Sequence, residues 1–71
     1  MNQKRLAMRI RQLRESKQFT QEQIAEVLGI HQPAYSEMES GRTVLSVPVL
    51  DKLARFYNLS WNDFNPAGAD W

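Results

Sequence analysis

The sequence predicts an all-α fold, a compact bundle of five short helices, from three observations. Apolar residues recur at three- and four-residue intervals, the spacing that places them on one face of a helix. Residues that favour helix starts and ends, above all Thr20 and Gly29, bound these stretches. No segment alternates apolar and polar residues as a half-buried strand does. The loops left between the helices are only a few residues long, as in a small helical bundle.

The first helix is predicted over about residues 3–16. Leu6, Ile10 and Leu13 are spaced i, i+4 and i+7 and form its buried face, while arginines occupy many of the remaining positions. A short connection then leads to Phe19, an apolar residue just before the next helix start, where it can pack back onto that helix.

The second helix begins at Thr20 and is ended by Gly29. Thr20 is a natural N-cap, and Gln23 completes a capping box, in which each side chain bonds the backbone N–H of the other residue. Glycine suits the helix end because a left-handed residue there avoids a Cβ penalty only if it is glycine. The inward face of this helix comprises Ile24, Ala25 and Leu28.

The third helix starts almost at once. His31 occupies the N-cap position, and Pro33 lies in the first turn, where its missing N–H costs nothing. Tyr35 and Met38 form the inward face, and Gly41 closes the helix. Two short helices around one glycine predict a helix-turn-helix.

Two further helices complete the predicted bundle. Ser46 is the expected N-cap of the fourth helix, Pro48 lies in its first turn, and Asn58 follows its end. A short fifth helix, WNDF, is expected after Ser60 as its N-cap, and Pro66 prevents its continuation. The predicted core comprises Leu6, Ile10, Leu13, Phe19, Ile24, Ala25, Leu28, Ile30, Tyr35, Met38, Leu50, Leu53, Ala54, Leu59 and Phe64.

Composition argues against several classes of protein. The chain has no cysteine and one histidine, so we expect no disulfide and no metal site. A single small domain leaves no room for a ligand pocket, so we expect no cofactor or small-molecule ligand. No apolar run approaches the roughly 20 residues of a membrane span, and the N-terminus lacks the apolar core of a signal peptide. We therefore expect a cytoplasmic protein with no membrane partner. Catalysis is not expected either, because no glycine-rich phosphate loop or nucleophile–base constellation is present.

Charge is divided unequally along the chain. Up to Lys17 there are six basic residues and one acid, whereas the remainder carries three basic residues and seven acids. A basic end suits contact with phosphate groups. The alternative is that these charges form only the solvated face of an amphipathic helix.

Four segments carry a family resemblance: IRQLRESKQF, TQEQIAEVLGI, HQPAYSEMESGR and LDKLARFYNLSWNDF. Together they resemble the phage-repressor and Cro-like helix-turn-helix domains, the lambda-repressor-like or XRE-like family, over most of the chain. The resemblance implies a DNA-binding domain over residues 1–66, followed by a flexible tail over residues 67–71. It also implies that the third helix lies in the major groove while the second crosses the DNA backbone.

The resemblance implies three sets of site residues. Gln32 can pair with adenine through two hydrogen bonds, and Glu37 can accept one from the cytosine N4 amine. A structural salt bridge is implied between Arg14 and Glu39. The implied base contacts are Gln32, Pro33, Ser36 and Glu37, and the implied phosphate contacts are Gln21, His31, Ser40, Gly41, Arg42 and Thr43.

Some residues depart from the family pattern. His31 replaces the usual serine or threonine N-cap, and when protonated it can contact a phosphate. Pro33 cannot donate a backbone hydrogen bond. Glu37 repels phosphates unless it finds a cytosine amine. Val44 and Leu45 fill a loop that is usually polar; they either pack under the fourth helix or form a homodimer interface.

The sequence favours a sequence-specific regulator of double-stranded DNA, a repressor that binds a palindromic operator as a homodimer. A phage regulator, the controller of a restriction-modification system and an antitoxin that represses its own operon all fit. The alternative is a protein-interaction module, such as a toxin-binding antitoxin, that keeps the fold with weak or no DNA binding.

Overall fold

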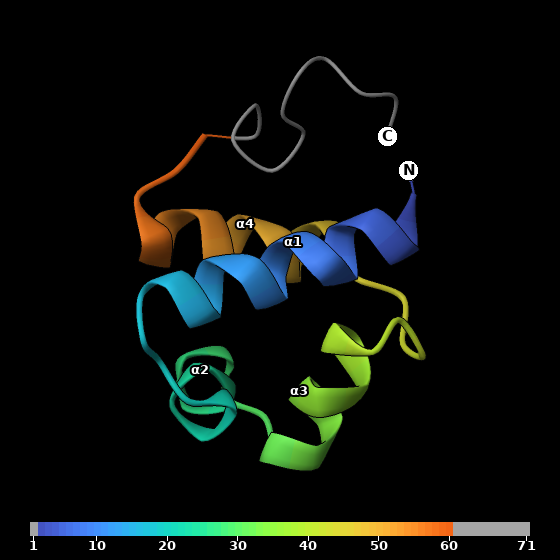
Figure 1. Ribbon diagram of the computed structural model, residues 1–71, viewed down its shortest axis with the longest axis horizontal. Coiled ribbons are helices and arrows are strands. Elements are labelled where there is room, and N and C mark those ends of the chain that lie inside the picture. The colour runs from blue at the N-terminus through green and yellow to red at the C-terminus, as the bar shows by residue number, and fades with distance from the viewer. Residues whose placement is uncertain (1, 61–71) are drawn as a thin grey trace.

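The computed structural model describes residues 2–60, which form four helices (Figure 1). They are α1 (Gln3–Ser16), α2 (Gln21–Leu28), α3 (Gln32–Glu39) and α4 (Val47–Tyr57). These four match the predicted helices, and the described part of the chain contains no strand. The predicted fifth helix, together with Phe64 of the predicted core, lies outside the described residues.

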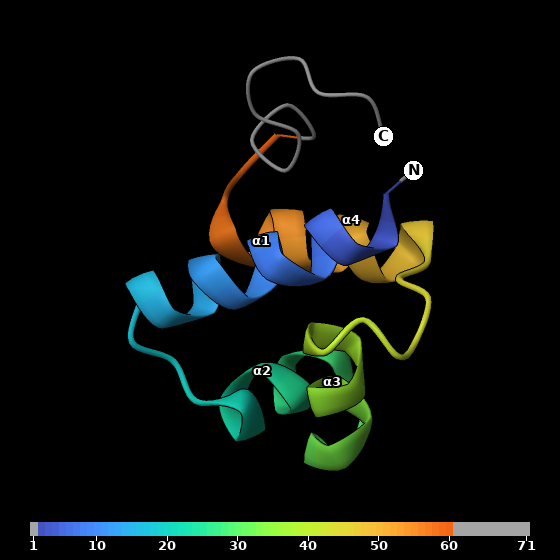
Figure 2. The same cartoon turned by 45° about the vertical axis from the view of Figure 1, so that its right-hand side comes forward.

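The four helices form two layers. In both Figure 1 and Figure 2, α1 and α4 lie in one layer and α2 and α3 lie in the other. The layers are joined by packing of α1 against α3 and of α2 against α4, and α2 also packs against α3. Within the described residues, no helix combines the length and apolar character needed to cross a membrane.

Helix ends follow the predicted local signals in most cases. The Thr20 hydroxyl accepts from the backbone N–H of Gln23, and the Gln23 side chain accepts from the backbone N–H of Thr20. Gly29 ends α2 with φ 72°, a left-handed conformation that glycine adopts without a Cβ penalty. Neither His31 nor Ser46 makes a side-chain cap hydrogen bond, although each occupies an N-cap position. Ser46 is thus the N-cap residue of α4 as predicted, although its hydroxyl does not bond a backbone N–H of the helix.

The core lies between the two layers. Phe19, Ile30, Met38 and Leu59, all predicted for the core, are partly buried and pack against its edge. Ala7 is buried although it was not predicted to be, Tyr57 is buried as expected for the inward face of the fourth helix, and Leu45 follows the packed alternative. The buried apolar residues are Leu6, Ala7, Ile10, Leu13, Ile24, Ala25, Leu28, Tyr35, Leu45, Leu50, Leu53, Ala54 and Tyr57.

Leu45 anchors the loop between α3 and α4. Its side chain is only 2% exposed, so it packs within the domain and cannot reach a second copy as the dimer hypothesis required. Its backbone N–H donates to Gln3 Oε1 over 2.6 Å, and its carbonyl accepts from Gln3 Nε2 over 3.4 Å. The Gln3 side chain, in the first turn of α1, thus holds the backbone of this loop at Leu45 through two hydrogen bonds.

Candidate nucleic-acid interface

The turn between α2 and α3 fixes how the two helices meet. After Gly29 ends α2, the backbone N–H of Ile30 donates back to the Ala25 carbonyl over 3.0 Å. Pro33 lies in the first turn of α3. Tyr35 on the inward face of this helix is fully buried, which turns the opposite face of α3 towards solvent.

The four predicted base contacts lie on α3, on or beside its solvent face. Gln32, Pro33 and Glu37 are exposed, and Ser36 is half-buried. Gln32 is the first residue of the helix, so its side chain projects from the end that would enter a groove.

A chain of hydrogen bonds links this exposed start of α3 to the interior. Gln32 Nε2 donates to Gln21 Oε1 over 2.7 Å, and Gln21 Nε2 donates to Glu39 Oε1 over 3.1 Å. Gln21 is the first residue of α2 and was predicted as a phosphate contact. Its amide therefore joins the starts of both helices, a link that the sequence analysis did not predict.

The ion pair expected between Arg14 and Glu39 is present. Arg14 Nε donates to Glu39 Oε2 over 2.6 Å, and a second guanidinium nitrogen donates to Glu39 Oε1 over 3.1 Å. The third nitrogen donates to the Phe19 carbonyl over 2.8 Å. The Glu39 side chain is 3% exposed and that of Arg14 is 13% exposed. The pair thus ties α1 to α3 behind the candidate interface.

Both partners of this pair are held in their charged forms. Burial by itself raises the pKa of Glu39, but the hydrogen bonds from Arg14 and Gln21, with the neighbouring Tyr35 hydroxyl, outweigh it and lower that pKa. The hydrogen bond to Glu39 is the largest cause that raises the pKa of Arg14. Because the two charges neutralise each other inside the domain, Arg14 is committed to Glu39 rather than to an external anion.

Two tyrosine hydroxyls lie buried close to this pair. Among the described residues, neither the Tyr35 nor the Tyr57 hydroxyl has a hydrogen-bond partner of regular geometry. Burial, followed by the interaction of its hydroxyl with the Glu39 carboxylate, raises the pKa of Tyr35. Burial and the negative charge of Glu39 raise the pKa of Tyr57 to about 12. Both tyrosines therefore stay neutral at physiological pH.

The loop after α3 carries four of the predicted phosphate contacts. Ser40, Gly41 and Arg42 are exposed, and Thr43 is half-buried. The Glu37 carbonyl accepts from the Ser40 hydroxyl over 2.9 Å and from the Arg42 backbone N–H over 3.0 Å. The Thr43 hydroxyl also donates to the Glu37 carboxylate over 3.3 Å. The loop is thus held against the end of α3 while the Arg42 side chain remains exposed.

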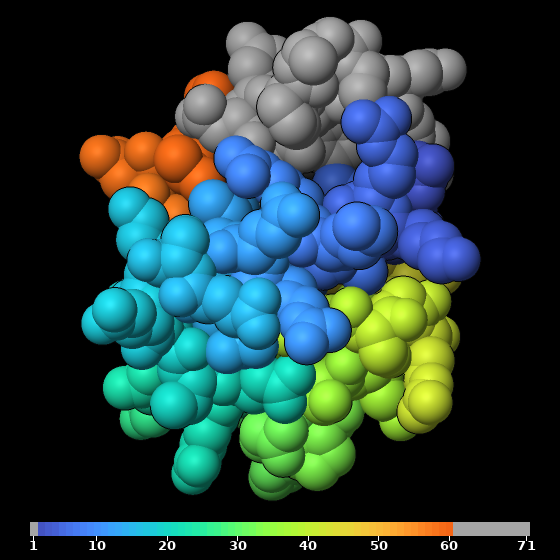
Figure 3. Space-filling view, in the orientation of Figure 1, coloured from blue at the N-terminus to red at the C-terminus, as the bar shows by residue number. Residues whose placement is uncertain are grey.

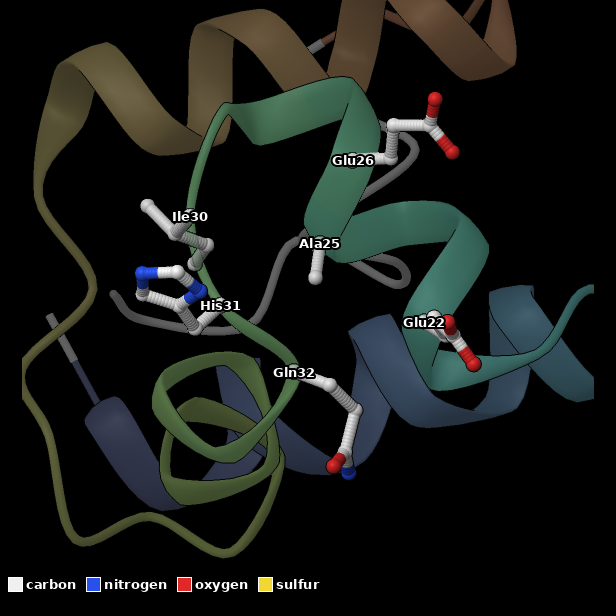
Figure 4. Close-up of a pocket in the computed structure, with 6 residues that line it drawn as sticks. All are labelled: Glu22, Ala25, Glu26, Ile30, His31 and Gln32. Atoms are coloured by element: carbon white, nitrogen blue, oxygen red, sulfur yellow. The ribbon is translucent and has the colours of Figure 1, made fainter.

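His31 lies apart from this loop, at the corner between α2 and α3. It lines a hollow of about 460 Å³ together with Gln32 and two carboxylates of α2, Glu22 and Glu26 (Figure 4). The carboxylates make this side of the corner acidic. Both carboxylates point away from His31 in Figure 4, and His31 precedes α3 whereas the predicted phosphate contacts of the loop follow it.

Apolar surface remains beside the loop. The Val44 side chain is 71% exposed and that of Val47 is 56% exposed. Because Leu45 between them is buried, only Val44 of the two predicted dimer contacts is on the surface. The described residues contain no group of three or more metal-ligating side chains.

A family model described as helix-turn-helix matches residues 10–64, a span that contains every site residue discussed above. Searches of curated proteins and of solved structures returned no match.

Proposed function

Because the chain belongs to the helix-turn-helix family, we propose that it is a sequence-specific regulator of transcription that binds double-stranded DNA. In the proposed complex, the start of α3 enters the major groove and the start of α2 meets the DNA backbone. The observation that carries this proposal is the hydrogen bond between Gln21 and Gln32, which prepares an exposed amide at the tip of α3.

The Gln21 contact orients the Gln32 amide for base recognition. It occupies one of the two Nε2 protons of this exposed residue and leaves the other proton and Oε1 available to a base. One remaining donor and one acceptor on a planar amide match the N7 acceptor and N6 amine of adenine. We assign Gln32 to an adenine on this basis.

The other proposed base contacts supply different chemistry. Glu37 is an acceptor for the cytosine N4 amine, and its carboxylate is already positioned by the Thr43 hydroxyl. Ser36 can donate to or accept from either kind of base, and Pro33 offers only apolar contact. Few hydrogen-bonding groups therefore read bases in each domain.

The proposed phosphate contacts frame these base contacts. Arg42 supplies a positive charge from the exposed loop, and Gln21 retains one amide proton beyond its contact with Glu39. Ser40, Gly41 and Thr43 belong to the same loop, and His31 is assigned a phosphate contact only in its protonated form.

A homodimer is the proposed active form, and repression by operator occupancy is its proposed mechanism. Two copies related by a two-fold axis place their α3 helices in successive major grooves, about 34 Å apart, and match a palindromic operator. Exposed Val44 and Val47 are the apolar residues proposed for contact between the copies. Occupancy of such an operator would exclude polymerase.

A second candidate function rests on the acidic corner. The carboxylates Glu22 and Glu26 repel DNA phosphates but suit a basic protein partner, such as a toxin bound by an antitoxin. In that case binding to the partner would persist in a chain that selects no DNA sequence.

Selection of bound sites from random double-stranded DNA tests the proposed function. We expect enrichment of two inverted half-sites whose centres are about one helical turn apart. Failure to enrich any sequence would refute sequence-specific binding and would favour the protein-interaction module.

A further inference from the structure

A second hollow, of about 180 Å³, opens where α1, α2 and α3 meet. Figure 3 shows side chains of these three helices coming together on one face of the molecule. The hollow adjoins the proposed DNA-binding face because it shares Gln21 and Ser36 with that face. Its lining residues are Arg11, Arg14, Gln21, Ser36, Glu39 and Ser40.

The lining residues differ in what they can still bind. Arg14 and Glu39 satisfy each other, so this pair adds no net charge to the hollow. Ser40 already donates its hydroxyl proton to the Glu37 carbonyl. One amide proton of Gln21 and the hydroxyl of Ser36 are left as neutral donors.

Arg11 is the lining residue whose guanidinium can leave its present partner and bind an anion in the hollow. Arg11 Nε lies 3.5 Å from Glu15 Oε2 in an i,i+4 pair, with side chains 62% and 54% exposed. Exposed pairs of this kind are weak and are screened by salt. A phosphate group that enters the hollow can therefore compete with Glu15 for the guanidinium.

The two hollows at the candidate interface differ in charge. Gln21 lines the hollow with Arg11, and its hydrogen-bond partner Gln32 lines the hollow with Glu22 and Glu26. A DNA phosphate is attracted by Arg11 in the first hollow and repelled by the carboxylates in the second.

We propose that the hollow between α1, α2 and α3 binds one backbone phosphate of the DNA duplex, with Arg11 as its cationic ligand. The free amide proton of Gln21 completes the set of donors, while Ser36 at the rim of the hollow stays with the bases. This phosphate contact from α1 rests on the proposed function and extends the footprint of each domain beyond the bases that α3 reads. Glu15 is the internal competitor that the phosphate displaces.

The test compares Arg11→Ala with the matched control Arg55→Ala. Arg55 is also an exposed arginine in an i,i+4 pair with a carboxylate, Asp51, but it lies on α4. Affinity for the selected site is measured over a range of salt concentrations. We expect Arg11→Ala to reduce the slope of log K against log salt by about 0.9, and Arg55→Ala to leave it unchanged. Equal slopes for the two variants would overturn the proposal.

Two further measurements sharpen the test. Glu15→Gln releases Arg11, so this variant should bind more tightly at low salt; unchanged or weaker binding would contradict the role given to Glu15. Ethylation of single phosphates should reveal one that is needed by the wild-type protein but not by Arg11→Ala, which identifies a DNA phosphate as the ligand. If ethylation interferes at the same positions for both proteins, the contact does not exist.

Failure of this inference can be told from failure of the proposed function. A wild-type protein that selects no DNA would overturn both. A wild-type protein that selects DNA and shows a shallower salt slope in Arg42→Ala but not in Arg11→Ala would overturn only the site in the hollow.

Discussion

Gln32 Nε2 donates a hydrogen bond of 2.7 Å to Gln21 Oε1, which joins the first residues of α2 and α3 through their side chains. Gln21 is bonded in turn to the buried carboxylate of Glu39, which Arg14 holds from α1. The exposed amide that we assign to base recognition therefore belongs to a network that begins inside the domain.

Replacement of Gln32 by Ala should relax base preference at one position of each half-site. Loss of a bidentate amide contact costs about 1 to 3 kcal/mol of discrimination. A selection from randomised sites, carried out on wild type and variant, measures the preference at every position. Gln12→Ala, which removes an exposed glutamine of α1, is the control and should leave all preferences intact. An unchanged preference in Gln32→Ala would exclude this residue from base recognition.

Gln21 and Gln32 should contribute to DNA binding jointly. If Gln21 orients the Gln32 amide, removal of Gln21 also weakens the contact between Gln32 and its base. The losses of DNA-binding free energy in Gln21→Ala and Gln32→Ala should therefore not add. Residues that share a hydrogen bond show coupling energies of about 0.5 to 3 kcal/mol. Affinities of the wild type, both single variants and the double variant for the selected site give this energy. Additive effects would mean that the two glutamines act independently.

Local signals explain why so much of the fold could be predicted from the sequence. The capping box of Thr20 and Gln23 and the left-handed Gly29 involve groups within one helical turn, so a short stretch contains all the information they need. The apolar spacing of α1 likewise identified Leu6 and Ile10 as buried.

Contacts between distant segments explain what could not be predicted. Leu45 lies in a loop without periodicity, it is buried, and its backbone bonds a Gln3 side chain 42 positions earlier. The Gln21 contact with Gln32 depends on the angle between two helices, which no residue pattern specifies. In the candidate site, the residue types were therefore predictable from the resemblance, while their hydrogen-bond partners were not.

Glu39→Gln should lower the free energy of unfolding by about 3 to 5 kcal/mol, because it leaves the Arg14 guanidinium without a counter-ion in the interior. Urea denaturation followed by circular dichroism measures the change. Glu15→Gln, which removes the exposed partner of Arg11, is the matched control and should change stability by no more than about 0.5 kcal/mol. Equal stability of the two variants would contradict a structural role for the buried pair.

The Glu39 carboxylate should make the free energy of unfolding depend on pH. The folded-state pKa of Glu39 lies below the ordinary glutamate value of 4.5. As pH falls, the unfolded state therefore binds a proton at Glu39 before the folded state does. Glu39 contributes fully to the free energy of unfolding above its unfolded-state pKa. This contribution is lost as pH falls through the folded-state pKa. Urea midpoints measured across this range should fall for the wild type and fall less for Glu39→Gln. If the urea midpoints of the wild type and of Glu39→Gln fall in parallel with pH, other carboxylates cause the acid sensitivity.

Val44 and Leu45 should respond differently to substitution. Val44→Asp places a charge on an exposed apolar surface, so it should convert a dimer into a folded monomer. Leu45→Ala empties part of the core and should cost about 2 to 5 kcal/mol of stability. Sedimentation reports the oligomeric state, and thermal denaturation reports the stability. A Val44→Asp protein that sediments like the wild type would remove Val44 from the dimer contact.

The salt dependence of DNA binding tests the central claim most directly, because contact with the phosphate backbone separates a DNA-binding regulator from a protein-interaction module. Affinity for the selected duplex should fall linearly in log K against log salt, by about 0.9 for each phosphate neutralised. Arg42→Ala should weaken binding to selected and random DNA alike and make the slope shallower by about one. Binding that is indifferent to salt, or an Arg42→Ala slope equal to that of the wild type, would contradict the account.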